Sequence, residues 1–178
     1  KPKLLILDET LSSLDQVEQS RLLELFERLQ AAHGLTYIFI SHDLAMVRRA
    51  CTRIAVMYLG RIVELADNHT TFFEPGHPYT RALLSAVPAI EPRRYDPAET
   101  LLEGEPPSPI NIAPGCSFRP RCPVALPRCA VDDPPSLARG GKGEAACFLA
   151  NASEAELATA QAATRAARSP EGAAVAAE

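Results

Sequence analysis

The first forty residues alternate between short apolar runs and an amphipathic segment. Residues 4–7 read Leu-Leu-Ile-Leu and residues 36–40 read Thr-Tyr-Ile-Phe-Ile, and such runs are typical of strands buried on both faces. Between them, Asp15 can cap a helix that Gly34 ends. A strand, a helix and a strand in this order predict a βαβ unit with two parallel strands, so we expect an α/β fold.

Further regular structure is predicted after this unit. A short helix is expected over residues 43–50. Residues 54–58 and 61–65 are expected to form two strands joined by a tight turn around Gly60. Another helix is expected over residues 79–87. The loops beyond it show little apolar periodicity, so we expect something other than a core, such as a bound metal, to hold them.

The composition of the chain changes near residue 70. Of its 16 prolines, 14 lie between Pro75 and Pro135, and 12 of its last 28 residues are alanine. We therefore predict three parts: an α/β part over residues 1–70, a Pro- and Cys-rich extension over 71–150, and an Ala-rich tail over 151–178. The tail is expected to be partly helical or disordered.

Charge and hydropathy exclude some classes of partner. The formal net charge of −4 provides no basic field for binding nucleic acid or anionic lipid. No run approaches eighteen uncharged apolar residues, so no membrane-spanning segment is predicted. The start of the chain does not have the pattern of a secretion signal, and clustered cysteines in that context are interpreted as metal ligands ahead of disulfides.

Two acidic residues and a histidine follow the two predicted strands. Asp8 and Glu9 come directly after the first strand, and Ser41 and His42 come after the second. Because the carboxyl ends of parallel strands meet at one edge of a sheet, we expect these side chains to lie together. One carboxylate can hold Mg²⁺ through water, and the other can orient or deprotonate an attacking water. The histidine can contact a terminal phosphate or that water.

These residues resemble the motifs of the ATP-binding subunits of ABC transporters. Residues 4–9 resemble the Walker B strand with its catalytic glutamate, and His42 resembles the H-loop, or switch, histidine. Ser13-Leu14-Asp15 resembles the D-loop. The family usually has proline where this chain has Thr10, a difference that changes the stiffness of the turn and not its charges. The resemblance implies the C-terminal part of an ABC-type P-loop NTPase domain with a parallel βαβ core.

The resemblance also implies roles for these residues. Asp8 would serve Mg²⁺, Glu9 would polarise the attacking water, and His42 would contact the γ-phosphate of ATP. Ser13 and Asp15 would lie at the interface between two such subunits and couple their sites. ATP and Mg²⁺ are therefore the implied cofactors.

Two motifs of the family are absent from these 178 residues. The sequence has neither a Gly-x-x-x-x-Gly-Lys-Ser/Thr phosphate loop nor a Leu-Ser-Gly-Gly-Gln-type signature. Both precede the Walker B strand in the family, so the chain is expected to be a fragment cut after the signature. We expect this polypeptide alone to bind no ATP usefully and to be inactive. By contrast, residues 54–64 are similar to the strand pair that follows the switch histidine.

Residues 76–79 read Gly-His-Pro-Tyr and resemble the start of the C-terminal extension of one ABC branch. That branch comprises importers of oligopeptides and dipeptides, with nickel importers as close relatives. The Pro-rich, Cys-bearing segment that follows matches the branch as well. His77 itself is interpreted as a residue at the start of a helix, ahead of Pro78, and not as a catalytic residue.

Four cysteines, Cys116, Cys122, Cys129 and Cys147, are spaced C-x₅-C-x₆-C-x₁₇-C. This spacing lacks the C-x₂₋₄-C pairs of zinc ribbons. A proline directly after Cys122 is more typical of an iron–sulfur ligand. The extension is similar to one that holds a [4Fe–4S] cluster in the peptide-importer branch, so the resemblance implies such a cluster here. Zinc, or no metal at all, is the alternative.

The surroundings of these cysteines suggest how the site works. Arg119, Arg121 and Arg128 lie among them and are expected to lower the pKa values of the thiols. The site is expected to be structural, because nothing in the sequence suggests an electron partner. Cys51 lies outside this segment and is interpreted as a small buried hydrophobe.

Together these patterns predict the C-terminal part of an ATPase subunit of a peptide-type ABC importer, at the cytoplasmic face of the cell membrane. The implied partners are a second ATPase subunit, membrane-spanning permease subunits and, indirectly, an external solute-binding protein. Nucleic acid is not expected as a partner. One alternative is a metal-binding interaction module in which the Cys-rich part is the active part. Another is a non-transport ATPase of the ABC type.

Overall fold

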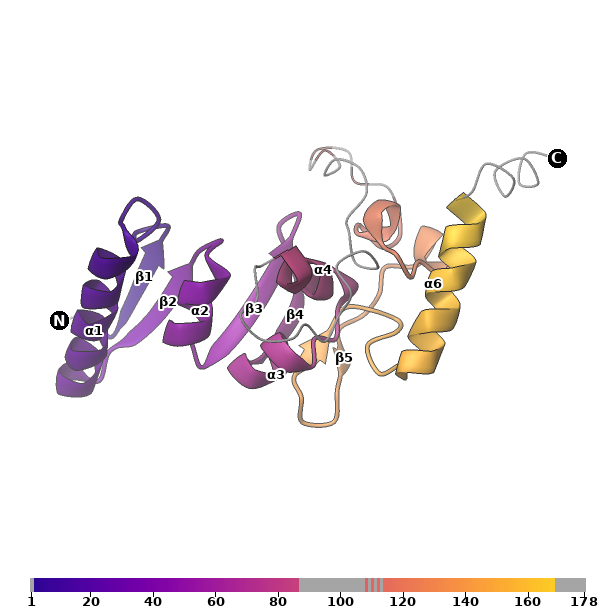
Figure 1. Cartoon of the computed structure of the whole chain (residues 1–178). Coiled ribbons are helices and arrows are strands. Elements are labelled where there is room, and N and C mark those ends of the chain that lie inside the picture. Colours follow the sequence, from indigo (N-terminus) through magenta and orange to yellow (C-terminus); the bar gives the residue numbers. More distant parts are fainter. Residues whose placement is uncertain (1, 87–107, 109, 111, 113, 169–178) are drawn as a thin grey trace. The chain divides into compact units, whose positions relative to one another are not determined.

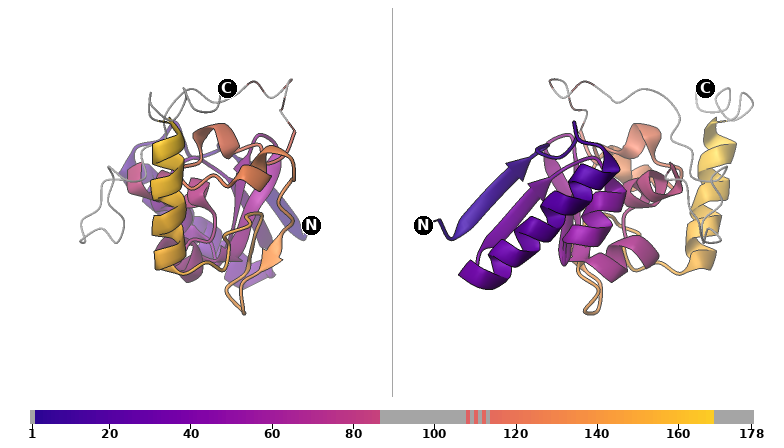
Figure 2. Two further views of the ribbon diagram at one scale, coloured as in Figure 1. Left: turned by 90° about the vertical axis from the view of Figure 1, so that its right-hand side faces the viewer. Right: turned by 60° about the vertical axis from the view of Figure 1, so that its left-hand side comes forward.

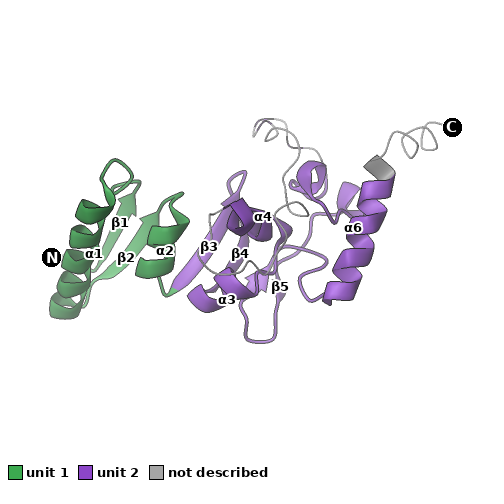
Figure 3. Cartoon of the chain, viewed as in Figure 1, with its two compact units in different colours: residues 1–52 green, residues 53–178 purple. Residues whose placement is uncertain are grey.

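The computed structural model of this chain describes residues 2–86, 108, 110, 112 and 114–168. The chain divides into two compact units, residues 1–52 and 53–178 (Figure 3). The composition changes only near residue 70, but strands from both sides of that point pair with one another in the second unit. Contacts and composition therefore divide the chain at different places.

The first unit contains the predicted βαβ arrangement (Figure 1). Strand β1 (Leu4–Asp8), helix α1 (Gln16–His33) and strand β2 (Thr36–Ile40) follow one another, and helix α2 (Leu44–Ala50) comes next. The two strands pair in parallel and in register along their whole length. The α/β fold predicted from the two apolar runs is therefore confirmed.

The ends of both helices lie at residues that the sequence indicated. The Asp15 carboxylate accepts the N–H groups of Val17 and Glu18, each at 2.9 Å, and so caps α1. Gly34 ends this helix in the left-handed conformation, with a φ of 62°, which glycine adopts without steric cost. Asp43 caps α2 in the same way as Asp15 caps α1.

Helix α1 covers one face of the β1–β2 pair (Figure 2). The rings of Phe26, Tyr37 and Phe39 pack between the helix and the strands, with centroids 5.5 to 6.0 Å apart. On the opposite face, Ile6 is 61% exposed and Ile38 is 46% exposed. The prediction that these strands are buried on both faces is therefore wrong within the described residues, because α1 covers one face and the other is open.

The second unit is built on an antiparallel sheet with the strand order β3-β4-β6-β5. Strands β3 (Arg53–Tyr58) and β4 (Arg61–Asp67) form the predicted hairpin. Leu59 and Gly60 form its two-residue turn with φ angles of 45° and 76°. Two consecutive positive φ values match the right-handed twist of the paired strands.

Two short strands from the Cys-rich part extend this sheet, β5 (Leu137–Ala138) and β6 (Glu144–Ala145). Gly143 allows β6 to approach β4. Its φ is 82°, and a Cβ at this position would lie 2.3 Å from the carbonyl oxygen of Leu65. The sequence did not predict these strands, because two residues are too few to show a period.

Several helices complete the second unit. They are α3 (Asn68–Phe73), α4 (Pro78–Ala86), the 3₁₀ helices η1 (Arg119–Arg121) and η2 (Pro127–Ala130), and α6 (Glu154–Arg168). Helix α4 matches the helix predicted over residues 79–87, of which Val87 lies outside the described residues. The Ala-rich tail is helical over α6, and residues 169–178 also lie outside the described residues. Across the described part of the chain, no helix has both the length and the apolar character that crossing a bilayer requires.

An apolar core joins the hairpin, the Cys-bearing loops and α6. Phe118 is 1% exposed, and its ring packs against those of Tyr58 at 5.2 Å and Tyr79 at 5.5 Å. Ala160 of α6 is buried in the same cluster. The expectation that these loops have no core of their own is therefore wrong, because an isolated aromatic side chain supplies core surface without producing a period. That a bound metal also holds them stays a prediction.

A buried acid–base pair connects the hairpin to the segment before α4. The Glu64 side chain is fully buried and accepts the N–H groups of Gly76 at 2.6 Å and His77 at 3.0 Å. The Arg139 guanidinium lies 3.6 Å from the Glu64 carboxylate and donates to the carbonyl of Glu74 at 2.9 Å. These contacts hold the backbone around Gly76 and His77 in place.

Candidate functional site

Glu9 and His42 meet at the carboxyl ends of β1 and β2. Glu9 directly follows β1 and His42 lies two residues after β2, and Nδ1 of His42 is 2.9 Å from Oε1 of Glu9. The Glu9 backbone belongs to the same edge, because its N–H donates to the Ile40 carbonyl at 2.9 Å. Parallel pairing thus brings together two side chains that are 33 positions apart in the sequence.

Glu9 has a strained backbone. Its φ of 49° lies in the left-handed region, which costs a non-glycine residue about 1–2 kcal/mol. The hydroxyl of Ser12 donates to the Glu9 carbonyl at 2.7 Å, and the Ser12 N–H donates to the same oxygen at 3.3 Å. Strain of this kind persists where neighbouring contacts hold it, and it is concentrated at functional sites.

The contact with Glu9 changes the titration of His42. The carboxylate hydrogen-bonds the ring and attracts its positive charge, so it raises the pKa of His42 above the usual value. Both side chains are open to solvent, with His42 80% and Glu9 42% exposed. An acid–base pair therefore stands where a phosphate or a water molecule can reach it.

The other residues predicted for this edge of the sheet have no direct contact with Glu9 or His42 among the contacts of the described residues. Asp8 is exposed at the end of β1. Ser13 is exposed, and Asp15 uses its carboxylate to cap α1. The structure therefore joins Glu9 to His42 directly, whereas Asp8 and Ser13 are exposed and the Asp15 carboxylate is engaged as a helix cap.

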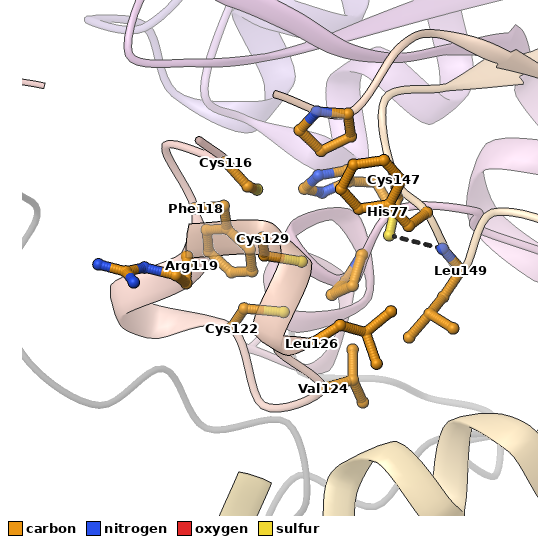
Figure 4. A pocket seen from close by; sticks show the side chains of 13 residues that line it. His77, Cys116, Phe118, Arg119, Cys122, Val124, Leu126, Cys129, Cys147 and Leu149 are labelled. Atoms are coloured by element: carbon orange, nitrogen blue, oxygen red, sulfur yellow. Dashed lines mark hydrogen bonds between the residues drawn. The ribbon is translucent and has the colours of Figure 1, made fainter. Parts of the chain in front are cut away.

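The four predicted cysteine ligands line one pocket of the second unit (Figure 4). Cys116 and Cys122 flank η1, Cys129 lies in η2, and Cys147 follows β6. The N–H of Cys116 donates to the carbonyl of Cys129 at 2.9 Å and ties two of the loops together. The structure thus brings together the four cysteines that the sequence singled out.

Burial dominates the pKa values of three of these thiols. It raises the pKa of Cys116 and of Cys122, and it raises that of Cys147 to about 11, because a thiolate loses hydration in the protein interior. Without a bound cation, these side chains are therefore neutral thiols near pH 7.

The arginines near these cysteines do not reverse this effect. Arg81 lowers the pKa of Cys147, but by less than burial raises it. Arg128 lies over the ring of Phe148, with Cζ 3.5 Å from the ring centroid. The prediction that the arginines of the Cys-rich segment lower the thiol pKa values is therefore wrong, because desolvation of the thiolate is the larger effect.

The described residues do not form a preassembled site for a single ion. Within residues 2–86 and 114–168, no group of three or more His, Cys, Asp or Glu side chains is placed to hold a metal ion. A zinc ion needs its thiolates within about 4.6 Å of one another, twice a Zn–S bond of about 2.3 Å. In a four-iron cluster each thiolate binds a different iron and the sulfurs stand farther apart. The four cysteines therefore line one pocket, but they are not arranged as a preassembled metal site in the part of the chain that the structure describes.

His77 lies in the wall of the same pocket, which the sequence did not indicate. It is 2% exposed, and burial lowers its pKa to about 4. Its Nδ1 accepts the N–H of Tyr79 at 3.0 Å, and Pro78 is the first residue of α4, so the predicted position at a helix start is confirmed. Nothing in the spacing could link His77 to Cys116, because 38 residues separate them.

The first unit is a βαβ unit in which Asp-Glu stands at the end of one strand and a histidine follows the next strand. This is the arrangement of part of an ABC-type ATPase domain. Comparison with known proteins specifies the family. The family model "Oligopeptide/dipeptide transporter, C-terminal region" matches residues 63–129. This match begins within β4 and covers the His-Pro-Tyr segment and three of the four clustered cysteines.

Individual relatives agree with this match. The chain is 48% identical over 149 residues to the probable peptide ABC transporter ATP-binding protein y4tS of Sinorhizobium fredii. It is 50% identical over 135 residues to the oligopeptide transport ATP-binding protein OppF of Escherichia coli. These alignments cover 84% and 75% of this chain but 42% and 40% of the relatives. The chain therefore belongs to the family of ATP-binding proteins of oligopeptide- and peptide-type ABC transporters, and it spans less than half the length of the relatives it matches.

Proposed function

We propose that the chain is part of the ATP-hydrolysing subunit of an ABC importer that drives peptide uptake from the cytoplasmic face of the cell membrane. The contact of 2.9 Å between Glu9 and His42 is the observation that supports this most directly. It joins a candidate base to a candidate phosphate ligand at the end of two parallel strands. The partners are a second ATPase subunit, the membrane-spanning permease subunits and, through them, an external solute-binding protein.

Each residue of this edge has a role in the proposal. Asp8 holds Mg²⁺ through water, because one carboxylate together with substrate phosphates suffices for this ion. Glu9 accepts a proton from the attacking water, and His42 contacts the γ-phosphate. Ser13 and Asp15 are exposed on the loop that precedes α1 and lie at the interface with the second subunit.

A chimeric subunit tests this function. The part of OppF that precedes the matched region is joined to this chain at the matching position. We expect the chimera to restore oligopeptide uptake in cells that lack OppF, and the Glu9→Gln chimera to fail at equal expression. Equal uptake by the two chimeras would exclude the proposed role of this edge in transport.

The Cys-rich segment has a proposed function of its own. We propose that Cys116, Cys122, Cys129 and Cys147 hold a [4Fe–4S] cluster, with a structural zinc ion as the alternative. The shared pocket of the four side chains supports it. A bound cluster would supply positive charge that makes thiolates stable despite their burial, and it would cross-link the three loops that carry them.

Anaerobic purification tests the cluster. The chain is expected to be brown, to contain about four irons and four sulfides, and to absorb broadly in the visible range. Changing any one of the four cysteines to serine should remove the colour, whereas Cys51→Ser should not. A colourless chain that carries one zinc would favour the alternative. Colour that depends on Cys51 and not on Cys147 would show that the ligands are different.

A further inference from the structure

The backbone of Glu9 is held at both of its polar groups. Its N–H donates to the Ile40 carbonyl at 2.9 Å, which ties it to the end of β2. Its carbonyl accepts the Ser12 hydroxyl at 2.7 Å and the Ser12 N–H at 3.3 Å. The first of these two distances is the usual one for an O–H···O hydrogen bond, whereas the second lies just beyond the usual N–H···O range. The Ser12 hydroxyl is therefore the main donor to this carbonyl within the described residues.

Ser12 lies in a turn that is itself anchored. The preceding residue, Leu11, is 3% exposed, and its carbonyl accepts a hydrogen bond from Nε2 of Gln19 in α1 at 3.0 Å. The Leu14 N–H donates to the same carbonyl at 3.2 Å. The Ser12 hydroxyl thus extends toward Glu9 from a turn that is fixed to helix α1.

The hydrogen bond from Ser12 matters because the backbone conformation of Glu9 is unfavourable. Its φ of 49° is one that residues other than glycine rarely adopt, and such a conformation persists only where surrounding contacts hold it. The net stabilisation from one hydrogen bond is of the same order as this strain. Without the Ser12 hydroxyl, the φ of Glu9 can return toward negative values, and the Cα–Cβ bond turns with it.

The direction of that Cα–Cβ bond decides whether the Glu9 carboxylate reaches His42. Oε1 of Glu9 lies 2.9 Å from Nδ1 of His42, and the two residues follow different strands. Both side chains are exposed to solvent, so close packing does not hold them together. Their contact therefore depends on the backbone from which the glutamate side chain extends.

We propose that Ser12 is a positioning residue for Glu9: its hydroxyl holds the left-handed backbone of Glu9 and so directs the carboxylate toward His42. Ser12 acts through the backbone carbonyl of Glu9 and not on the nucleotide. The consequence for catalysis rests on the ATP hydrolysis proposed above. The consequence for the contact between Glu9 and His42 does not, and it can be measured in the chain alone.

Three variants separate the Ser12 hydroxyl from its surroundings. Ser12→Ala removes the hydroxyl, and Ser12→Thr keeps one at the same position. Thr10→Val is the matched control, because it removes a nearby hydroxyl that lies 3.5 Å from the Asp8 carbonyl and has no hydrogen bond to Glu9 among the described residues. Circular dichroism checks that each variant is folded. If Ser12→Ala were not folded, Ser12→Cys, whose S–H is a weak donor, would replace it with the same expected direction of change.

NMR titration of His42 measures its contact with Glu9 in the chain alone. The Glu9 carboxylate raises the pKa of His42, and so does the charge of Asp43, which is the same in every variant. We expect the pKa of His42 to fall in Ser12→Ala toward its value in Glu9→Gln. In Ser12→Thr and Thr10→Val it should stay near that of the parent chain.

The same variants of the chimera described above measure the effect on hydrolysis. Ser12→Ala should lower kcat roughly 10- to 100-fold, because a displacement of a reacting group by about 1 Å can cost as much. The affinity for ATP should stay near that of the parent chimera, and Ser12→Thr should restore most of the rate. A purely structural role of Ser12 would lower the amount of folded chimera and not the turnover of each folded molecule.

Other results would overturn the inference. A His42 titration curve that is the same in folded Ser12→Ala and in the parent would show that the hydroxyl does not position Glu9. An equal shift in Thr10→Val would show that the effect is not specific to Ser12. A shifted titration with unchanged turnover in Ser12→Ala would contradict the role in hydrolysis. If the Glu9→Gln chimera hydrolysed ATP as fast as the parent chimera, the proposed function would fail, and the titrations would still decide whether Ser12 positions Glu9.

Discussion

At the scale of single residues, Glu9 and His42 depend on each other. Glu9 raises the pKa of His42 in the folded chain, so protonation of the ring favours the folded state. This contribution is complete below the pKa of the unfolded chain and is lost as the pH rises through the raised value. Because both side chains are exposed, solvent and salt screen the interaction.

Changing Glu9 to Gln tests this coupling in the chain as it stands. The amide keeps the size of the side chain but removes its charge, so the pKa of His42 should fall toward the usual value. NMR titration of the histidine ring signals measures this directly, and the other histidines provide an internal reference. A His42 titration curve that stays in place would show that the contact with Glu9 does not persist in solution.

The same change in a complete subunit tests the catalytic role. Glu9→Gln should leave ATP binding intact and slow hydrolysis by roughly 10²–10⁴-fold, the range for loss of a general base. His42→Ala should slow hydrolysis to a similar degree, because a γ-phosphate contact is removed. Separate measurements of nucleotide affinity and turnover distinguish the two effects. If Glu9→Gln abolished ATP binding, Glu9 would be needed to bind the nucleotide and its role as the base for the attacking water would be wrong.

Arg139 is a residue whose charge matters for folding. It is 10% exposed, faces the fully buried Glu64 carboxylate and donates to two backbone carbonyls, those of Glu74 and Ala150, each at 2.9 Å. Arg139→Ala should lower the free energy of unfolding by about 3–5 kcal/mol, because it leaves a buried charge without its partner. Urea unfolding measures this loss.

Lys142 provides the matched control for Arg139. It is an exposed cation that pairs with the Glu74 carboxylate on the same surface. Lys142→Ala should cost less than about 1 kcal/mol, since exposed ion pairs contribute little. Equal losses in the two variants would mean that burial of the Arg139–Glu64 pair has no energetic consequence.

At the scale of elements, the second unit depends on the approach of β6 to β4. Ala145 pairs with Glu64 and Glu144 pairs with Leu65, so a two-residue strand ties the Cys-rich part to the hairpin. The backbones come close because Gly143, just before β6, has no side chain. The pairing of these elements therefore requires a particular residue type at a particular position.

Two alanine substitutions separate the clash from the backbone strain. Gly140 and Gly143 both have positive φ angles, 57° and 82°, but a Cβ at Gly140 meets nothing within 4 Å, whereas one at Gly143 meets the Leu65 carbonyl oxygen at 2.3 Å. Both variants lose stability through strain at positive φ. Gly143→Ala should lose roughly a further 1–3 kcal/mol through overpacking. Thermal unfolding measures the difference, and equal melting temperatures would contradict the close approach of β6.

At the scale of the whole molecule, the chain corresponds to only part of its relatives. It has the carboxylate–histidine edge but no phosphate loop, and it spans less than half the length of its relatives. The exposed face of the β1–β2 pair carries Leu4, Ile6, Ile38 and Ile40. A cluster of this kind is more stable when other protein covers it.

The isolated chain should therefore show no measurable ATPase activity. The backbone amides and the lysine that hold the β- and γ-phosphates in P-loop proteins are missing from the sequence, so nucleotide is not placed next to Glu9. Steady-state phosphate release checks this, and the chimera with the upstream part of a relative is the positive control. Robust turnover by the isolated chain that disappears in Glu9→Gln would disprove the prediction.

The sequence by itself determined the features that depend on neighbouring residues or on strand direction. The caps at Asp15 and Gly34 are local hydrogen-bond and backbone preferences. The meeting of Glu9 with His42 follows from parallel pairing, because equivalent ends of parallel strands lie at one edge. Burial on both faces could not be settled in this way, since it depends on what packs against each face.

Only the tertiary structure decided how the second unit is held together and what surrounds its cysteines. Phe118 enters the core from a loop without any period, and His77 joins the cysteine pocket although it lies 39 positions before Cys116 in the sequence. The direction of the thiol pKa shifts was predicted incorrectly because the sequence shows nearby arginines but not desolvation. Burial arises from contacts between distant segments, and no local pattern carries that information.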